Sequence, residues 1–110
     1  MERGVRRHSV IARYWAATTT KENAPLYAHH LSSSVFPELQ RLSGYEGGKL
    51  LQRDDRGRVE VIVITFWKSL ESIRAFAGDD LEQAVVPDKA AALLSDYDRR
   101  VKHFEVIAGQ

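Results

Sequence analysis

The segment Arg58–Trp67, RVEVIVITFW, predicts a β-strand that is apolar on both faces, and it constrains the fold more than any other stretch. Successive side chains of a strand point to opposite faces, so five residues share one face: Val59, Val61, Val63, Thr65 and Trp67. Ile62, Ile64 and Phe66 point to the other face. Because one layer of helices covers only one face of a sheet, the second apolar face predicts a homodimer formed through the sheet.

The first part of the chain predicts a strand followed by a long helix. Ser9–Ala17 alternates β-branched and aromatic residues, which favours a strand. The apolar residues that follow recur at steps of three and four and share one helical face: Ala24, Ala28, Leu31, Val35, Leu39 and Leu42. We expect this helix to begin near Asn23, with Pro25 in its first turn, and to bend at Pro37.

A second strand and a tight turn are expected before the apolar strand. Tyr45–Arg53 reads as a strand, and its Gly47-Gly48 pair indicates a bulge or a close approach of another part of the chain. Asp54–Gly57 has the composition of a hairpin turn, in which the glycine can adopt a positive φ.

The rest of the chain predicts two more helices and a last strand. Ser69 is a suitable N-cap for a helix over Leu70–Ala77, and Pro87 can open a second helix over Asp88–Asp96. Arg99–Ala108 then supplies a fourth strand. The resulting order β-α-β-β-α-β predicts an α+β, ferredoxin-like fold, with an antiparallel sheet and both helices on one face.

Length, charge and cysteine content narrow the class of protein. The 110 residues suit a single domain over residues 9–110, preceded by a flexible tail over residues 1–8. The 16 Lys and Arg against 15 Asp and Glu give no signal for nucleic-acid binding. The absence of cysteine excludes disulfides and thiolate metal sites, and a cytoplasmic protein is favoured. The longest apolar run, Val61–Trp67, is too short to span a membrane.

Four stretches together resemble the antibiotic biosynthesis monooxygenase type of dimeric α+β barrel: VIARYWA, LSGYEGGKLL, VIVITFWKSLESIRAFAG and YDRRVKHFEV. The resemblance implies a homodimer and an oxidoreductase. It points to a cofactor-independent monooxygenase that acts on an aromatic, phenolic or quinol-like small molecule. The same family includes haem-degrading enzymes and members with no known activity, so a non-catalytic small-molecule-binding domain and a structural dimer stay open as alternatives.

The haem-degrading branch of the family relies on an Asn near the end of the first strand, a Trp on the second helix and a His shortly after it. Counting from Trp67, this chain has Phe76 in place of the helix Trp and Val86 in place of the His. Ala12 or Arg13 takes the place of the Asn. The resemblance therefore predicts neither haem chemistry nor any bound cofactor.

Several residues are candidates for a ligand site. Trp67 is expected at the mouth of an apolar pocket with Phe76 beside it, although a core or interface role fits Trp67 equally well. Tyr27 and His30 are three residues apart on the long helix and could handle a proton together, whereas solvated helix positions are the alternative. His103 on the last strand could meet either of them inside the fold.

Other polar residues give weaker signals. His29 and His30 point about 100° apart on a helix and cannot share a metal ion. Arg13, Arg74 and Arg100 could each hold an anionic substrate, but surface ion pairs are the simpler expectation for all three. No phosphate-binding loop, nucleophile elbow or metal motif is found in the sequence.

Overall fold

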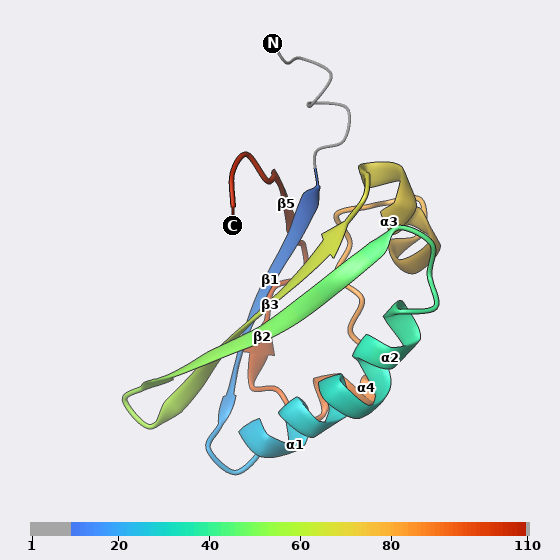
Figure 1. Ribbon diagram of the computed structural model, residues 1–110. Helices are drawn as coiled ribbons and strands as arrows, with labels where there is room; N and C mark the ends of the chain where they lie inside the picture. The colour runs from blue at the N-terminus through green and yellow to red at the C-terminus, as the bar shows by residue number, and fades with distance from the viewer. Residues whose placement is uncertain (1–9, 110) are drawn as a thin grey trace.

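The computed structural model describes residues 10–109 as a five-stranded antiparallel sheet with helices on one face (Figure 1). The strands are β1 (Ile11–Thr20), β2 (Tyr45–Asp55), β3 (Arg58–Trp67), β4 (Asp96–Tyr97) and β5 (Lys102–Glu105). The sheet order is β2-β3-β1-β4, and β5 also pairs with β1. This confirms the predicted α+β, ferredoxin-like class. The tail expected over residues 1–8 lies outside the described residues.

The helical layer contains one long element and two short ones. The long element consists of α1 (Ala24–His30), the π-helical segment η2 (Leu31–Val35) and α2 (Phe36–Leu39). The others are α3 (Leu70–Ala77) and α4 (Asp88–Ala91). Ser69 caps α3 as predicted: its hydroxyl accepts from the Ser72 backbone N–H, and the Ser72 hydroxyl accepts from the Ser69 N–H.

The π-helical segment explains how the long helix accommodates Pro37. Proline has no backbone N–H, and its ring collides with the carbonyl four residues before it in a regular α-helix. The turn before Pro37 is therefore widened, and the Phe36 N–H donates to the Leu31 carbonyl, five residues back. The expected distortion at Pro37 is thus a π turn on its N-terminal side.

The last third of the chain differs from the sequence prediction. The helix expected over Asp88–Asp96 ends at Ala91, because the Ser95 N–H donates to the Thr18 carbonyl of β1 and joins the chain to the sheet. The strand expected over Arg99–Ala108 is reduced to β5. Residues 99–101 bond instead to the segment 82–84, where Ala84 and Val101 donate to carbonyls of the opposite segment.

The β2–β3 hairpin carries the two features that its glycines predicted. Arg56 and Gly57 form a two-residue turn, and both have a positive φ. The register shifts by one residue between Tyr45 and Gly47, which is the expected bulge. A Cβ at Gly48 would lie 2.9 Å from a ring carbon of Phe36, so the helix approaches the strand closely at this position.

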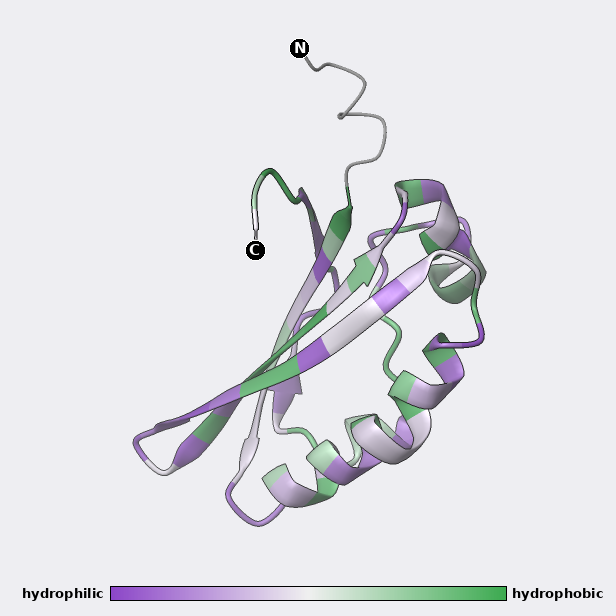
Figure 2. Cartoon of the chain, in the orientation of Figure 1, coloured by the Kyte–Doolittle hydropathy of each residue, from purple (hydrophilic) through white to green (hydrophobic). Residues whose placement is uncertain are grey.

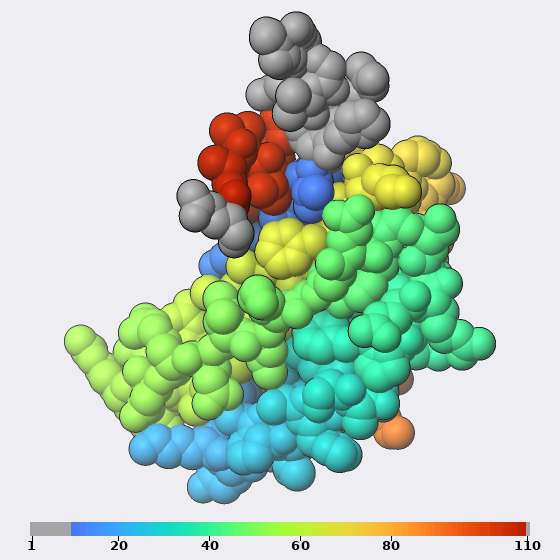
Figure 3. Space-filling model, in the orientation of Figure 1, coloured from blue at the N-terminus to red at the C-terminus, as the bar shows by residue number. Residues whose placement is uncertain are grey.

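The two faces of the sheet are both apolar, as predicted. Val61 and Trp67 point to the helices and are fully buried. Ile62, Ile64 and Phe66 point to the outer face and are half-buried. Figure 2 shows the hydrophobic colour along β3 and a hydrophilic hairpin tip, and in Figure 3 atoms of β3 reach the surface between β1 and β2.

Buried apolar side chains form two clusters between sheet and helices. The larger one lies under α1 and contains Trp15, Tyr27 and Leu31. The smaller one lies under α3 and contains Leu39, Trp67 and Ile73. Val35 and Phe36, on the π turn and just after it, touch both clusters. The space between the clusters, beneath this turn, is where the candidate site lies.

Candidate functional site

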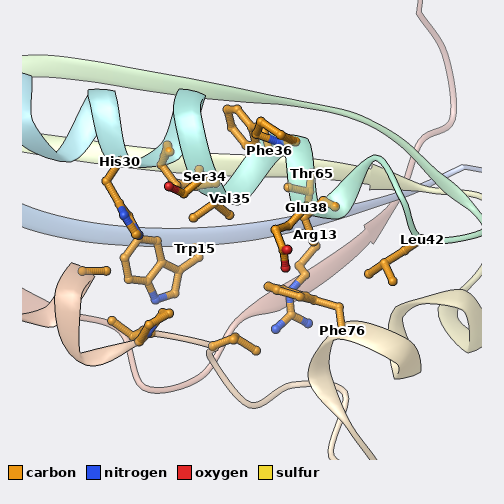
Figure 4. A pocket seen from close by; sticks show the side chains of 18 of the residues that line it. Arg13, Trp15, His30, Ser34, Val35, Phe36, Glu38, Leu42, Thr65 and Phe76 are labelled. Carbon is orange, nitrogen blue, oxygen red and sulfur yellow. The ribbon is translucent and has the colours of Figure 1, made fainter.

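A cavity of about 800 Å³ opens between the inner face of the sheet and the helical layer (Figure 4). Its floor is formed by residues of β1 and β3, and its roof by the long helix from Tyr27 to Leu42. Phe76 of α3 and residues 85–87 complete the wall. Most of these side chains are aromatic or aliphatic, and a few are polar, as is typical of a small-molecule site.

Trp15, Tyr27 and His30 form one end of this cavity. The Tyr27 ring centroid lies 6.4 Å from those of both Trp15 and His30. The three-residue step on α1 thus brings Tyr27 and His30 together, as the sequence predicted. Burial raises the pKa of the Tyr27 hydroxyl above its usual value, so Tyr27 is a neutral hydroxyl at physiological pH.

The Nε2 atom of His30 is buried and has no hydrogen-bond partner among residues 10–109. A buried polar atom without a partner is costly and rare in a folded protein. His30 lines the cavity and its ring lies beside Trp15 in Figure 4. His29, its neighbour in sequence, is exposed. One of the two helix histidines is therefore placed to exchange a hydrogen bond or a proton with a ligand.

Arg13 forms the other end of the cavity and is only 4% exposed. Its Nη1 donates to the Leu81 carbonyl and lies 3.0 Å from Nε2 of His103, while Nη2 donates to the Gln83 carbonyl at 2.7 Å. The guanidinium carbon lies 5.4 Å from the centroid of the Phe76 ring. These contacts hold the cation between β1, the segment 81–83 and α3.

The charge of Arg13 is not neutralised by a carboxylate of the described residues. Burial lowers its pKa to about 10, so it still carries its charge at neutral pH. Arg74 instead pairs with Glu71 and Asp79. Arg100 pairs with Asp80 and Glu82, also at the surface. The expectation of a surface ion pair is therefore right for Arg74 and Arg100 but wrong for Arg13, which the strand alternation turns inward.

His103 contacts Arg13 and not the helix residues Tyr27 and His30. It lies opposite Arg13 in the β1–β5 register, and so it does not join Tyr27 and His30. A guanidinium has no acceptor, so Nε2 of His103 must carry the lone pair and Nδ1 the proton. Burial and, to a smaller extent, the Arg13 charge lower the pKa of His103, which keeps the ring neutral at physiological pH.

Phe76 lines the cavity as predicted, but Trp67 does not stand at its mouth. The two rings are stacked, with centroids 6.0 Å apart, and Trp67 has no exposed surface. The Trp67 indole N–H donates to the Thr65 hydroxyl at 2.9 Å, which satisfies it within the core. Trp67 therefore supports Phe76 from behind.

Sequence reasoning gave Glu38 no site role and offered Arg13 as an anion-binding residue only behind the simpler expectation of a surface ion pair. Glu38 of α2 lines the cavity and lies near Phe76 in Figure 4. The π turn before it sets its direction, and the helical periodicity of the sequence does not indicate that turn. Arg13 had a detectable signal, because positions 13, 15, 17 and 19 alternate along β1 and form its buried face. A charged residue in such a stripe is unusual.

Within residues 10–109, no three His, Asp or Glu side chains are grouped so that they could hold a metal ion. In the same range, no helix has the length and apolar character needed to cross a membrane.

Solved structures with the same architecture come from several bacteria. A protein from Bacillus cereus, provisionally assigned as an antibiotic biosynthesis monooxygenase, superposes with a TM-score of 0.65 at 16% identity. The superposition covers 93% of this chain and 97% of that one. The chain has the antibiotic biosynthesis monooxygenase fold. Comparison with protein-family models and with curated proteins finds no match.

Proteins with this fold differ in what they bind. A monooxygenase from the ActVA-Orf6 gene of Streptomyces coelicolor, in complex with nanaomycin D, has a TM-score of 0.55 at 12% identity, covering 94% of this chain and 90% of that one. The haem degrader MhuD of Mycobacterium tuberculosis, with two haems in its active site, has a TM-score of 0.57 at 18% identity, covering 91% and 98%. At these identities the likeness concerns the fold alone.

The two positions that the resemblance assigns to the haem-degrading Trp and His do line the cavity. They are Phe76 and Val86, and neither side chain has an atom that can bind iron. The donor set at these positions therefore does not fit haem degradation.

Proposed function

We propose that this protein binds a planar hydroxyarene in the cavity and oxygenates it with dioxygen, without a cofactor. The observation that carries the proposal is the buried, unpartnered Nε2 atom of His30 in a largely apolar cavity of about 800 Å³. The cavity has the size of a small-molecule site. The monooxygenase of Streptomyces coelicolor with the same fold supports the reaction class.

The proposed reaction balances without an external reductant. A phenol with a free ring C–H reacts with one O₂ to give a quinone and one water. The ring carbon gains one oxygen atom, the second oxygen leaves as water, and the substrate supplies all four electrons. The protein must therefore bind the ring, remove the phenolic proton and keep bulk water out.

His30 is the residue that we assign to the proton transfer. Its Nε2 accepts the phenolic proton, which produces the phenolate that can donate an electron to dioxygen. The neutral Tyr27 hydroxyl beside it can donate a hydrogen bond to the same oxygen. Trp15 and Phe76 provide the flat apolar surfaces against which the substrate ring packs.

Oxygen consumption with a panel of naphthols and anthrones that have a free ring C–H tests this function. We expect uptake of one O₂ per quinone formed and one ¹⁸O atom in the product from ¹⁸O₂, with no added flavin, haem or metal. His30→Gln should reduce kcat at least 100-fold while ligand binding is kept, because a base contributes about 10²–10⁴-fold. His29→Gln, at the exposed neighbouring position, is the matched control and should retain activity.

A non-catalytic binding domain is the second candidate function. The inner cavity would serve such a domain equally well, because binding needs no proton acceptor. Tight binding of members of the panel with no oxygen uptake would favour this candidate and contradict the proposed reaction.

We also infer that two copies pair through the outer face of the sheet and that the protein acts in the cytoplasm. On that face Leu51 is 46% exposed and Phe104 is 52% exposed, beside the half-buried Ile62, Ile64 and Phe66. Phe104 also contacts Tyr14 edge-on across β1 and β5. An apolar patch of this kind is typical of an interface between subunits. The cytoplasmic setting rests on the absence of cysteine.

A further inference from the structure

We propose that the ligand of this cavity is an aromatic carboxylate whose anionic group pairs with Arg13. This inference rests on the proposed function and adds a substrate class to it: a hydroxyarene that also carries an acid group. Arg13 has three features that favour such a ligand: a buried charge, unused hydrogen-bond donors and a position opposite His30.

Arg13 lacks a counter-charge among the described residues. A buried cation is normally paired with an anion, because removing a charge from water is costly. Arg13 is surrounded by two carbonyls, a neutral imidazole and the Phe76 ring. These groups are dipoles or polarisable surfaces, and none within the described residues forms an ion pair with it. An anion in the adjoining cavity would supply the missing charge.

The Arg13 guanidinium also has hydrogen-bond donors without an acceptor among the described residues. A guanidinium has five N–H donors. The Leu81 carbonyl, the Gln83 carbonyl and His103 take three of them from Nη1 and Nη2. No acceptor within residues 10–109 takes the Nε–H or the second N–H of Nη2. The Nε and Nη2 atoms lie on one edge of the planar group, and such an edge can bind a carboxylate through both of its oxygens.

The shape of the site also favours such a ligand. Phe76 lies against the guanidinium and lines the cavity, so a ligand ring that packs on Phe76 would bring a substituent close to Arg13. Arg13 and His30 lie at opposite ends in Figure 4. A ligand with an acid at one end and a phenol at the other would satisfy both polar ends at once.

Three charged groups of the lining act on such an anion. Arg13 and the exposed Arg41 attract it, and the Glu38 carboxylate on the roof repels it. Glu38 forms no ion pair with Arg13. A variant that removes the Glu38 charge should therefore bind the anion more tightly than the natural protein does.

A purely structural role for Arg13 is the competing explanation. Its bonds to Leu81 and Gln83 tie β1 to the segment between α3 and α4, which could be its whole contribution. A structural strut would stabilise the fold but would not distinguish a charged ligand from a neutral one of the same shape.

A matched pair of probes separates these explanations. We would measure binding of 2-naphthoate and 2-naphthamide at pH 7 by isothermal titration calorimetry, since the two differ in charge and hardly in shape. The natural protein should bind naphthoate at least ten-fold more tightly than naphthamide. Arg13→Gln should reduce that ratio to about one and leave the naphthamide affinity within two-fold, and Glu38→Gln should raise the ratio.

Each outcome decides between the proposals. Equal binding of the two probes by the natural protein would overturn the carboxylate site while leaving the proposed cavity function intact. No binding of either probe would count against both. If Arg13→Gln does not fold, the natural protein and Glu38→Gln still test the proposal. An affinity ratio of naphthoate to naphthamide that is unchanged or lower in Glu38→Gln would contradict it.

Discussion

Nη1 of Arg13 lies 3.0 Å from Nε2 of His103, although 90 positions separate the two residues in sequence. Pairing of β1 with β5 places them side by side on the inner face of the sheet. The interaction requires the neutral imidazole, because a protonated ring would have no lone pair to offer and would add a second positive charge.

Stability should therefore fall at acidic pH through His103. Its pKa is lowered in the folded state, mainly by burial, below the ordinary value of 6.5. Between these two values the unfolded chain binds the proton more readily, so the free energy of unfolding decreases as pH falls below about 6.5. Urea denaturation at pH 7.5 and pH 5.5 measures this difference.

His103→Gln tests the assignment, because the Gln side-chain oxygen can accept from Arg13 but does not titrate. The variant should lose less stability than the natural protein between the two pH values. His29→Gln, at an exposed helix position, should behave as the natural protein does. An unaltered pH dependence in His103→Gln would mean that another group controls it.

The two tryptophans should respond differently to a ligand. Trp15 lines the cavity, whereas Trp67 is enclosed behind Phe76. Trp67→Phe should lower the free energy of unfolding by about 1–3 kcal/mol, through lost volume and the lost bond to Thr65, yet retain the change in fluorescence on binding 2-naphthamide.

Trp15→Phe is the matching variant and should lose most of that fluorescence change. The chain has two tryptophans, so the tryptophan fluorescence of each variant comes from the one that remains. If Trp67→Phe abolished the signal and Trp15→Phe retained it, the ligand would lie beside Trp67 and the assigned cavity would be wrong.

A charge on the outer face of the sheet should dissociate the inferred dimer. Ile64 lies on that face between Tyr14 of β1 and Lys49 of β2. We expect the natural protein to sediment as a dimer at micromolar concentration and Ile64→Lys to be monomeric or unfolded, because an unpaired buried charge costs several kcal/mol. Leu26→Lys, on the exposed side of α1, should remain dimeric. A monomeric natural protein would contradict the dimer.

The turn before β2 should not tolerate a side chain at Gly44. This residue has φ of 91°, and an added Cβ would lie 2.5 Å from Cβ of Ser72 on α3. We expect Gly44→Ala to lower the free energy of unfolding by about 2–4 kcal/mol from backbone strain and overpacking together. Urea denaturation measures the loss.

Gly57→Ala separates these two causes. Gly57 has φ of 87°, but nothing lies within 4 Å of an added Cβ. Gly57→Ala should therefore lower the free energy of unfolding by about 1–2 kcal/mol, through backbone strain alone. Equal losses for both variants would show that the contact with Ser72 adds nothing.

Local patterns in the sequence were sufficient to predict those elements in which the buried residues recur with strand or helix periodicity. The alternation in Arg58–Trp67 predicted both faces of β3, and Ser69 and Gly78 gave the limits of α3. The last third of the chain was predicted less well. There the hydrogen bonds of Ser95 and of residues 99–101 go to distant segments, and no local pattern records such partners.

The candidate site likewise contains contacts that local spacing predicts and contacts that depend on distant segments. Tyr27 and His30 share one helix, so their spacing predicted that they meet. Arg13 and His103 come together only through the pairing of β1 with β5, and Trp67 is enclosed behind Phe76 by packing with Leu39 and Ile73 of the helical layer. Side-chain direction at the ends of elements depends on these tertiary contacts.

The π turn over Leu31–Val35 makes the cavity depend on the number of residues in the helix as well as on their identity. A π turn holds one residue more than an α turn, so it absorbs an extra residue while Leu39 still faces the core. Deleting one residue from Ser32–Ser34 would shorten this turn to α-helical spacing and leave Leu39 on the same face, so that the change would be confined to the part of the roof where Ser33 and Ser34 line the cavity. Length variation in this helix therefore offers a way to reshape the roof of the pocket without altering a single residue of the sheet beneath it.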